Sequence, residues 1–486
     1  MEPVAFQPSM LLAILPEIGL LLLAGLILVL DLVWRGAARR MLSWVTAGGL
    51  VLIAVLALLF TQPGSEPQLI FGGMLRLDGM SFIFRLIFLT GAALTAMFMS
   101  NYEPEGRQGE FYALMLVSTL GMNLMAASAD LIMLYLAIET TSLPLYILAG
   151  FMTRDPRSTE AGIKYFLFGA MTAAVMLYGF SLLYGFSGTT SLYGLAAQIQ
   201  NIPAALLVLA AVLVLVGFGF KVSAVPLHFW APDVYEGAPT PVAGFLSTAS
   251  KAAGFAVLMR FGQAVFPDIA GSWVLIVAVI AAASMIIGNV LAAVQKNIKR
   301  LLAYSSIAQA GYILAGVFAG TQFGYTAATY YLISYLVTNM AAFGIVSLIG
   351  RTICSDEISA YRGLQRRNPG LALALMLALL SLGGVPPLSG FIGKVLVFGA
   401  AIQQGWMGIA LVVIGVLTSV VALYYYLIVI RTVYTGQPEG GTRPLLVTPA
   451  MRAALIVCMV GILFFGFVLG PAYTVSTLGA QGLFSF

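Results

Sequence analysis

The stretch GFGFKVSAVPLHFWAPDVYEGAPTPV, residues 217–242, decides how this chain folds. An apolar run carries a single lysine, Lys221, and meets Pro226 five residues later. A proline removes a backbone donor and clashes with the preceding helical turn, so a helix through this stretch must break there. Because apolar sequence continues beyond the proline, we expect a discontinuous helix whose lysine lies in a hydrophobic environment.

The composition predicts a membrane protein along the whole chain. Hydrophobic residues make up 61% of the 486 residues and charged residues only 8%. A soluble protein of this length needs far more charge on its water-facing surface. The longest polar pieces, residues 153–162, 351–370 and 435–449, are too short for a soluble domain. The sequence therefore predicts an all-α polytopic membrane protein without an extramembrane catalytic unit.

Cysteine and histidine are too few to build a redox centre. Cys354 and Cys458 lie far apart without a C-x-x-C spacing, and His228 is the single histidine. Iron–sulfur and zinc sites need clustered thiolates or imidazoles, so we expect no cofactor and no metal in this chain. The first apolar run has no basic region before it and no small-residue cleavage site, and we expect a retained span rather than a removed signal.

Spanning helices are predicted wherever roughly 20 apolar residues follow one another, because that length crosses a bilayer. The chain has about fourteen such runs. We expect them to begin near Met10, Met41, Gly79, Phe111, Leu131, Gly162, Ile202, Pro241, Ser272, Leu301, Phe323, Gly370, Gly408 and Ala450.

The loops alternate in charge, and this alternation predicts the orientation. Loops after even-numbered spans contain Arg76 and almost no other basic residue. Because basic loops stay on the cytoplasmic side, we expect both termini to face the periplasm of a bacterial inner membrane, or its equivalent. We attribute the net charge of +5 to this bias and predict no nucleic-acid binding. The basic residues after odd-numbered spans are Arg35, Arg39, Arg40, Arg107, Arg154, Arg157, Lys296, Lys299, Arg300, Arg351, Arg362, Arg366, Arg367, Arg431, Arg443 and Arg452.

A second broken helix indicates an internal repeat. In SLGGVPPLSGFIGKVLVF, residues 381–398, the helix meets Pro386 and Pro387 and then carries Lys394. The broken spans are the seventh and the twelfth, and a five-helix unit repeated in tandem is inverted because five crossings is an odd number. We predict an N-terminal three-helix segment over 1–108, a first repeat over 109–265, a second, inverted repeat over 266–436 and a C-terminal helix over 437–486.

Four ionisable residues lie deep in apolar segments: Glu139, Lys221, Lys251 and Lys394. Charge in hydrocarbon is costly and rare, so these residues are candidates for a cation pathway, most plausibly for protons. Snorkelling is the alternative explanation for the lysines, and a structural salt bridge for Glu139. The functional interpretation places Glu139 near Lys221 as a buried pair that acts as a switch.

Two further residues are less decided. Lys164 lies near the expected start of the sixth span, where snorkelling to the interface competes with a role in the pathway. His228 either carries protons between Lys221 and Lys251 or is a satisfied residue of the helix break. Other charged residues are expected to cap or pack helices: Asp130 as an N-cap, and Glu17, Asp31, Arg85 and Arg260 as packing or interface residues. Tyr424, Tyr425 and Tyr426 are interpreted as ordinary helix lining.

Residues 217–242, with STASKAAGF (247–255), KRLLAYSSIAQAGYILAG (299–316) and residues 381–398, closely resemble the antiporter-like subunits of respiratory NADH–quinone oxidoreductase, complex I. The resemblance runs through nearly the whole chain. It implies fourteen transmembrane helices with two inverted five-helix repeats and broken seventh and twelfth helices. The proton-channel residues of that family fall on Glu139, Lys164, Lys221, Lys251 and Lys394.

Within this family the chain resembles the N type. The M type has a glutamate where Lys394 stands, and the L type carries a further lateral helix after the fourteenth span. Residues 381–436, with LTSVVALYYY, also look like photosynthetic relatives that take electrons from ferredoxin, so the electron donor stays open.

The resemblance implies a proton-translocating membrane subunit without a redox group of its own. NADH, FMN, iron–sulfur clusters and quinone are expected in partner subunits, with an M-type and a small K-type subunit as neighbours. The path would run from the basic side to Lys221, through His228 or water to Lys251, and out past Lys394. The alternatives are a subunit of a multisubunit cation/proton antiporter and a membrane-arm spacer that conducts nothing.

Overall fold

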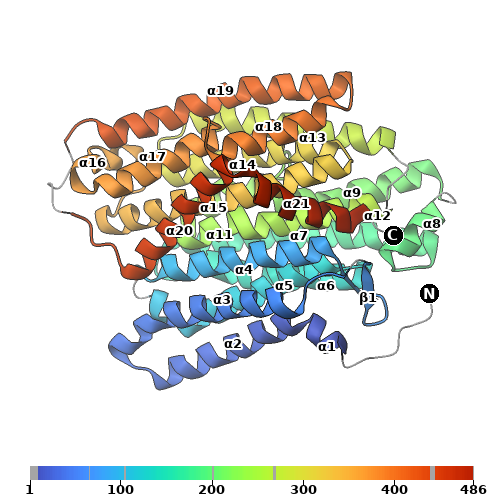
Figure 1. Ribbon diagram of the computed structural model, residues 1–486, viewed down its shortest axis with the longest axis horizontal. Helices are drawn as coiled ribbons and strands as arrows, with labels where there is room; N and C mark the ends of the chain where they lie inside the picture. Colours follow the sequence, from blue (N-terminus) through green and yellow to red (C-terminus); the bar gives the residue numbers. More distant parts are fainter. Residues whose placement is uncertain are drawn as a thin grey trace.

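The computed structural model describes residues 9–64, 66–102, 105–199, 202–265, 270–437 and 444–484. Figure 1 shows a bundle of nearly parallel helices, with the N-terminal helices α2 (Leu15–Val33) and α3 (Leu42–Phe60) at one edge and α19 (Trp406–Tyr434) at the other. The remaining α-helices are α1 (Ser9–Ala13), α4 (Gly79–Met99), α5 (Gly109–Ala127), α6 (Leu131–Ala149), α7 (Pro156–Ser187), α8 (Leu192–Ile199), α9 (Ala204–Val222), α10 (Trp230–Gly237), α11 (Thr240–Phe245), α12 (Lys251–Val265), α13 (Ala270–Ala293), α14 (Ile298–Phe318), α15 (Gln322–Ile353), α16 (Leu364–Arg367), α17 (Pro369–Gly383), α18 (Ser389–Ile402), α20 (Pro449–Phe467) and α21 (Leu469–Phe484).

Shorter elements join the helices. They are the 3₁₀ turns η1 (Gly36–Met41), η2 (Glu105–Arg107) and η4 (Ile358–Tyr361), the π-helical turn η3 (Leu246–Ser250), and the antiparallel strands β1 (Gln68–Ile70) and β2 (Leu75–Leu77).

The prediction of about fourteen spans is confirmed. Thirteen segments of the described chain are long and apolar enough to cross a membrane, and α17 and α18 are shorter apolar helices that together form the twelfth span. The largest error in a predicted start is in the sixth span, which begins at Pro156 rather than near Gly162. Asp155 caps this helix through its side chain, so the polar sequence before Gly162 is already helical.

The seventh and twelfth spans are broken as expected, and the two breaks have the same backbone pattern. In the seventh, the Ala224 N–H bonds back to the Gly219 carbonyl at 2.8 Å. In the twelfth, the Val385 N–H bonds to the Leu380 carbonyl at 3.0 Å. Each helix therefore ends with a hydrogen bond from one N–H to the carbonyl five residues earlier, just before the proline of the break. This bond satisfies a carbonyl that the interrupted helix would otherwise leave free.

The loops gather at the two ends of the bundle. At the basic end the Arg351 guanidinium pairs with Glu105 at 3.3 Å, and Asn297 and Glu357 form a β-bridge. At the opposite end lie the hairpin β1–β2 and α8 (Figure 1). This segregation agrees with the predicted alternation of basic residues between the two sets of loops. Of those basic residues, Arg443 lies outside the described part of the chain.

The C-terminal segment differs from the prediction of one helix over 437–486. The structure divides it into α20 and α21, and residues 438–443 lie outside the described part. Helix α20 ends at Phe467, four residues before Pro471, where the proline ring would meet the carbonyl of a continued helix. Helix α21 then packs against α4 and α15.

The repeat boundaries remain a prediction. Helix α5 begins at Gly109 and α19 ends at Tyr434, close to the predicted limits of the two repeats. The predicted junction at 265/266 adjoins residues 266–269, which lie outside the described residues.

Candidate functional site

Lys221 lies at the end of α9, directly before the first break, and its side chain is buried. Its Nζ donates a hydrogen bond of 2.5 Å to the Ser142 hydroxyl on α6. Glu139, one turn earlier on α6, lines the same cavity of about 10 Å³, roughly the space of one water. Glu139 Oε1 is buried and has no hydrogen-bond partner in the described part of the chain.

The predicted Glu139–Lys221 pair is therefore only partly formed. The two side chains face one small cavity, yet they form no ion pair within the described structure, because Lys221 binds Ser142 instead. Lys221 is bound to the hydroxyl, and the Glu139 carboxylate lines the same cavity.

Lys251 is the first residue of α12 and is fully buried. It directly follows the π-helical turn η3, a departure from α-helical geometry that recurs at functional sites in helices. Its Nζ donates to the Ser306 hydroxyl at 2.7 Å and to the Ser306 carbonyl at 2.8 Å. Gly254 lets α12 approach α9, since a Cβ there would lie 3.0 Å from Lys221 Cβ.

Lys394 lies on α18, just beyond the second break, and is also buried. Its Nζ donates to the Gly383 carbonyl at 3.1 Å and to the Ser419 hydroxyl at 3.2 Å. It also lies 4.6 Å from the centre of the Tyr312 ring, close enough for the ring to stabilise a positive charge. The end of α17, a hydroxyl of α19 and a ring of α14 thus surround Lys394, and no carboxylate of the described residues binds it.

Helix α14 connects the surroundings of Lys251 and Lys394, since it carries both Ser306 and Tyr312. Buried polar side chains lie beside it. The Asn289 amide donates to the Tyr312 hydroxyl at 3.0 Å and accepts from Tyr425 at 3.1 Å. Along the same helix, Ser305 hydrogen-bonds Tyr426 at 2.5 Å, and Tyr331 donates to Gln309.

The interpretation of the three consecutive tyrosines needs correction. Tyr424 is exposed, as expected for helix lining, whereas Tyr425 and Tyr426 are buried and hydrogen-bonded within this polar group. Their partners lie on α13 and α14, so the roles of three adjacent tyrosines depend on which face of α19 meets those helices.

Sequence reasoning missed the serines that bind the lysines. Ser142, Ser306 and Ser419 each accept a hydrogen bond from one of them. Ser142 follows Glu139 by three residues and so shares its helical face, which was a usable signal. Ser306 and Ser419 lie far from their lysines in sequence, and serine is common in membrane helices, so composition alone could not single them out.

His228 lies inside the first break, between α9 and α10. Its ring packs against Phe229 with the centroids 4.5 Å apart, and its Nδ1 is buried with no hydrogen-bond partner among the described residues. The described hydrogen bonds do not join His228 to Lys221 or Lys251, so its role as a carrier stays a prediction.

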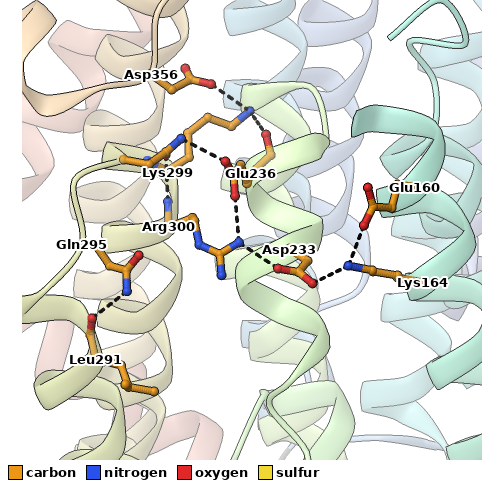
Figure 2. Close-up of polar contacts among 10 residues, drawn as sticks. Glu160, Lys164, Asp233, Glu236, Leu291, Gln295, Lys299, Arg300 and Asp356 are labelled. Atoms are coloured by element: carbon orange, nitrogen blue, oxygen red, sulfur yellow. Dashed lines mark hydrogen bonds and ion pairs between the residues drawn. The ribbon is translucent and has the colours of Figure 1, made fainter. Parts of the chain in front are cut away.

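Lys164 lies apart from Lys221, Lys251 and Lys394, in a charged cluster at the basic end (Figure 2). Its half-exposed ammonium pairs with Glu160 at 2.7 Å and with Asp233 of α10 at 2.6 Å. Asp233 also pairs with Arg300 at 2.8 Å, and Arg300 with Glu236 at 2.7 Å. The cluster surrounds an open, polar hollow of about 230 Å³ and ties α10 to α7 and α14.

Charged residues at the opposite end serve the fold. Arg260 is buried and makes two hydrogen bonds of 2.8 Å to the Asp78 carboxylate. Arg85 pairs with Glu17 at 2.9 Å. The Asp130 side chain caps α6 as predicted, accepting from the Ile132 N–H at 2.8 Å.

Residues 128–422 match the family model described as NADH:quinone oxidoreductase/Mrp antiporter, TM, which is more than half of the chain. The chain belongs to this family. It is 43% identical over 484 residues to NAD(P)H-quinone oxidoreductase subunit 2 of Synechococcus sp., covering 96% of this chain and 91% of the relative. It is 41% identical over 492 residues to NADH-quinone oxidoreductase subunit N of Chlorobium chlorochromatii, covering 96% and 95%.

A chain of respiratory complex I from Thermus thermophilus has the same fold. The TM-score is 0.79 at 37% identity, over 94% of this chain and 98% of that chain. The resemblance identified from residues 217–242 and the related stretches is therefore confirmed, as is the all-helical membrane fold.

Proposed function

We propose that this chain is the proton-translocating, N-type membrane subunit of a quinone oxidoreductase complex, and that Glu139, Lys221, Lys251 and Lys394 carry the protons. Quinone reduction takes place in partner subunits and drives rearrangements of these buried charges. The N-type assignment is supported by the relative from Chlorobium chlorochromatii, which matches this chain over nearly its full length.

One observation carries this proposal: three lysines buried in the bundle each face a serine hydroxyl. A hydroxyl accepts a hydrogen bond from a protonated lysine and donates one to a neutral lysine, so it serves both protonation states. A structural salt bridge instead supplies a carboxylate, as Asp78 does for Arg260. The lysines are therefore solvated in a manner that permits proton exchange.

The polar hollow at the basic end is the proposed access side. It is bordered by α10, the helix that follows the first break, and water can enter it from outside. Protons would pass from there to the cavity shared by Glu139 and Lys221. They would continue through His228 or water to Lys251, and along the polar side chains of α14 to Lys394.

The energies involved are of compatible size. Moving one elementary charge across the membrane costs about 2.3 kcal/mol per 100 mV. Two unit charges about 4 Å apart interact by about 4 kcal/mol at an effective dielectric constant near 20. Forming or releasing one close Glu139–Lys221 pair would therefore change the energy by an amount of the same order as that cost.

The surroundings follow from this assignment. The basic end would face the cytoplasm of a bacterial inner membrane and the termini the periplasm. An M-type and a small K-type subunit would be neighbours, and NADH, FMN, iron–sulfur clusters and quinone would belong to partner subunits. A ferredoxin-fed complex is the alternative for the electron donor, because residues 381–436 resemble those of photosynthetic relatives.

The decisive test is Lys221→Ala in the intact complex. We expect proton translocation to be lost and quinone reduction to fall with it. Unchanged pumping and unchanged quinone reduction in the assembled variant would refute the proposal. Purification of the native complex distinguishes this proposal from the cation/proton antiporter alternative, because an antiporter subunit would be purified without flavin or iron–sulfur subunits. If the subunit were a non-conducting spacer, the complex would keep its proton stoichiometry in a Lys221/Lys251/Lys394 triple variant.

A further inference from the structure

A groove at the basic end combines positive charge with a long apolar wall. It lies between the beginnings of α17 and α20 and has a volume of about 480 Å³. Arg367 and Arg452 lie at its charged end, and the described residues that line it include no acidic side chain. It is distinct from the hollow around Lys164, where acids and bases alternate.

The charged end is built to attract an anion. Pro369 and Gly370 open α17 there, and Arg452 lies in the first turn of α20. The N-terminus of a helix carries a partial positive charge, so an arginine at that position is unfavourable unless an anion is nearby. Two helix N-termini and two guanidinium groups thus converge on one place.

The apolar wall of the groove runs from this charged end along the side of the helix bundle. On α20 it consists of residues that recur at helical spacing on one face, and on α17 it includes Leu371 and Ala374. From Arg452 to Leu463 the stripe is about 16 Å long at 1.5 Å per residue, the scale of a lipid chain crossing part of a leaflet. The α20 residues are Leu455, Ile456, Met459, Val460 and Leu463.

The floor of the charged end is fixed. The Leu445 N–H donates to the Asn368 side-chain oxygen at 2.7 Å, and the Asn368 amide donates to the Leu445 carbonyl at 3.3 Å. This pair holds the segment before α20 against the start of α17. The backbone segments that carry Arg367 and Arg452 are therefore held together by these hydrogen bonds.

We propose that this groove binds an anionic phospholipid of the leaflet at the basic end, with its phosphate between Arg367 and Arg452 and an acyl chain along α20. Charge complementarity selects this occupant: basic pockets between membrane helices on the cytoplasmic side suit anionic headgroups. A groove of about 440 Å³ beside Leu131 and Tyr184 offers a comparison, since no charged side chain lines it.

The test uses photoactivatable phosphatidylglycerol and phosphatidylcholine, each with a diazirine in one acyl chain. The full-length chain in nanodiscs, and separately the intact complex, are irradiated, and labelled peptides are identified by mass spectrometry. We expect phosphatidylglycerol to label peptides from α17 and α20 up to about 25-fold more than phosphatidylcholine does, because each arginine near the headgroup contributes about fivefold to the selectivity. R367Q/R452Q should therefore bring labelling by the two lipids close to equal.

Two further variants make the result specific. Val460 is exposed in the groove, so Val460→Trp should fill it and reduce labelling by both lipids while the fold is kept. Arg154 is an exposed arginine of the same end outside the groove, and Arg154→Gln should change nothing. Equal labelling by the two lipids, or selectivity that survives R367Q/R452Q, would overturn the proposal. So would the absence of label on α17 and α20 in the intact complex, which would mean that another subunit covers the groove.

Discussion

The hydrogen bond between Lys221 and Ser142 gives the sharpest prediction. Lys221 Nζ lies 2.5 Å from the Ser142 hydroxyl and shares a cavity of about 10 Å³ with Glu139. Replacing Ser142 by valine removes this acceptor, and the additional methyl group occupies the space that a water would need to replace it. Among the described residues that line this cavity, the alternative partner of opposite charge for the ammonium group is the Glu139 carboxylate.

The size of the effect follows from the bond that is lost. A hydrogen bond to a charged group contributes about 1.5–3 kcal/mol. Loss of that energy would favour Lys221 paired with Glu139 over Lys221 unpaired by roughly 10- to 150-fold more than before, since about 1.4 kcal/mol corresponds to a tenfold change. We therefore expect Ser142→Val to slow proton translocation by about tenfold or more through over-stabilisation of the pair.

The assay compares quinone reduction and proton uptake in membrane vesicles that contain the assembled complex. Thr172→Val is the matched control, because Thr172 lines the same cavity but donates its hydroxyl only to carbonyls of its own helix. In a Glu139→Gln background the carboxylate cannot capture the lysine, so Ser142→Val should add little to the residual rate. Equal rates for Ser142→Val and Thr172→Val, or an undiminished effect in the Glu139→Gln background, would refute this reasoning.

Two other predictions concern charged residues outside the lysine series. Lys164→Met should leave pumping nearly unchanged and cost less than about 1 kcal/mol of stability, because the ion pair of Lys164 with Asp233 is about one-third exposed. Arg300→Met breaks the bridges to both Asp233 and Glu236. It should therefore lower the melting temperature of the solubilised chain more than Lys164→Met does. Asp78→Ala should destabilise the chain by about 3–5 kcal/mol, because it leaves Arg260 buried without its carboxylate partner and also removes the side-chain cap of α4. Asp130→Ala, which loses only a helix cap, should cost about 1 kcal/mol. Equal melting temperatures for these two variants would contradict the first estimate.

The sequence was sufficient for the features that depend on local chemistry. Apolar length located the spans, Pro226 and the Pro386–Pro387 pair located the two breaks, and the cost of charge in hydrocarbon identified Lys221, Lys251 and Lys394 as buried. Each of these follows from a property that neighbouring residues share along the chain. The end of α20 before Pro471 is a feature of the same kind, because a proline in the sequence indicates it. The prediction of one helix over 437–486 did not include it.

The partners of the lysines could not be predicted because they depend on how distant helices pack. Ser306 meets Lys251 across 55 positions of sequence, and Asp233 meets Lys164 across 69. Membrane helices are apolar around most of their circumference, so periodicity does not reveal which face meets a neighbour. The placement of Lys164 among carboxylates, rather than in the bundle interior, is a consequence of that packing.

The contrast between the two kinds of lysine surroundings explains why the buried series suits proton transfer. An ionised carboxylate only accepts hydrogen bonds, so it stabilises a protonated lysine and opposes the neutral form. Lys164 lies between Glu160 and Asp233 and is held as a fixed cation. Lys221, Lys251 and Lys394 instead each bind a serine hydroxyl, and Lys251 and Lys394 also bind a backbone carbonyl. A hydroxyl can accept from a charged lysine and donate to a neutral one. Among the residues that the structure describes, Glu139 is the carboxylate beside this series, and it lines the same cavity as Lys221 without being bound to it. In the proposed mechanism, control of that contact would favour or release the proton of the first lysine, while the others would exchange theirs without breaking an ion pair.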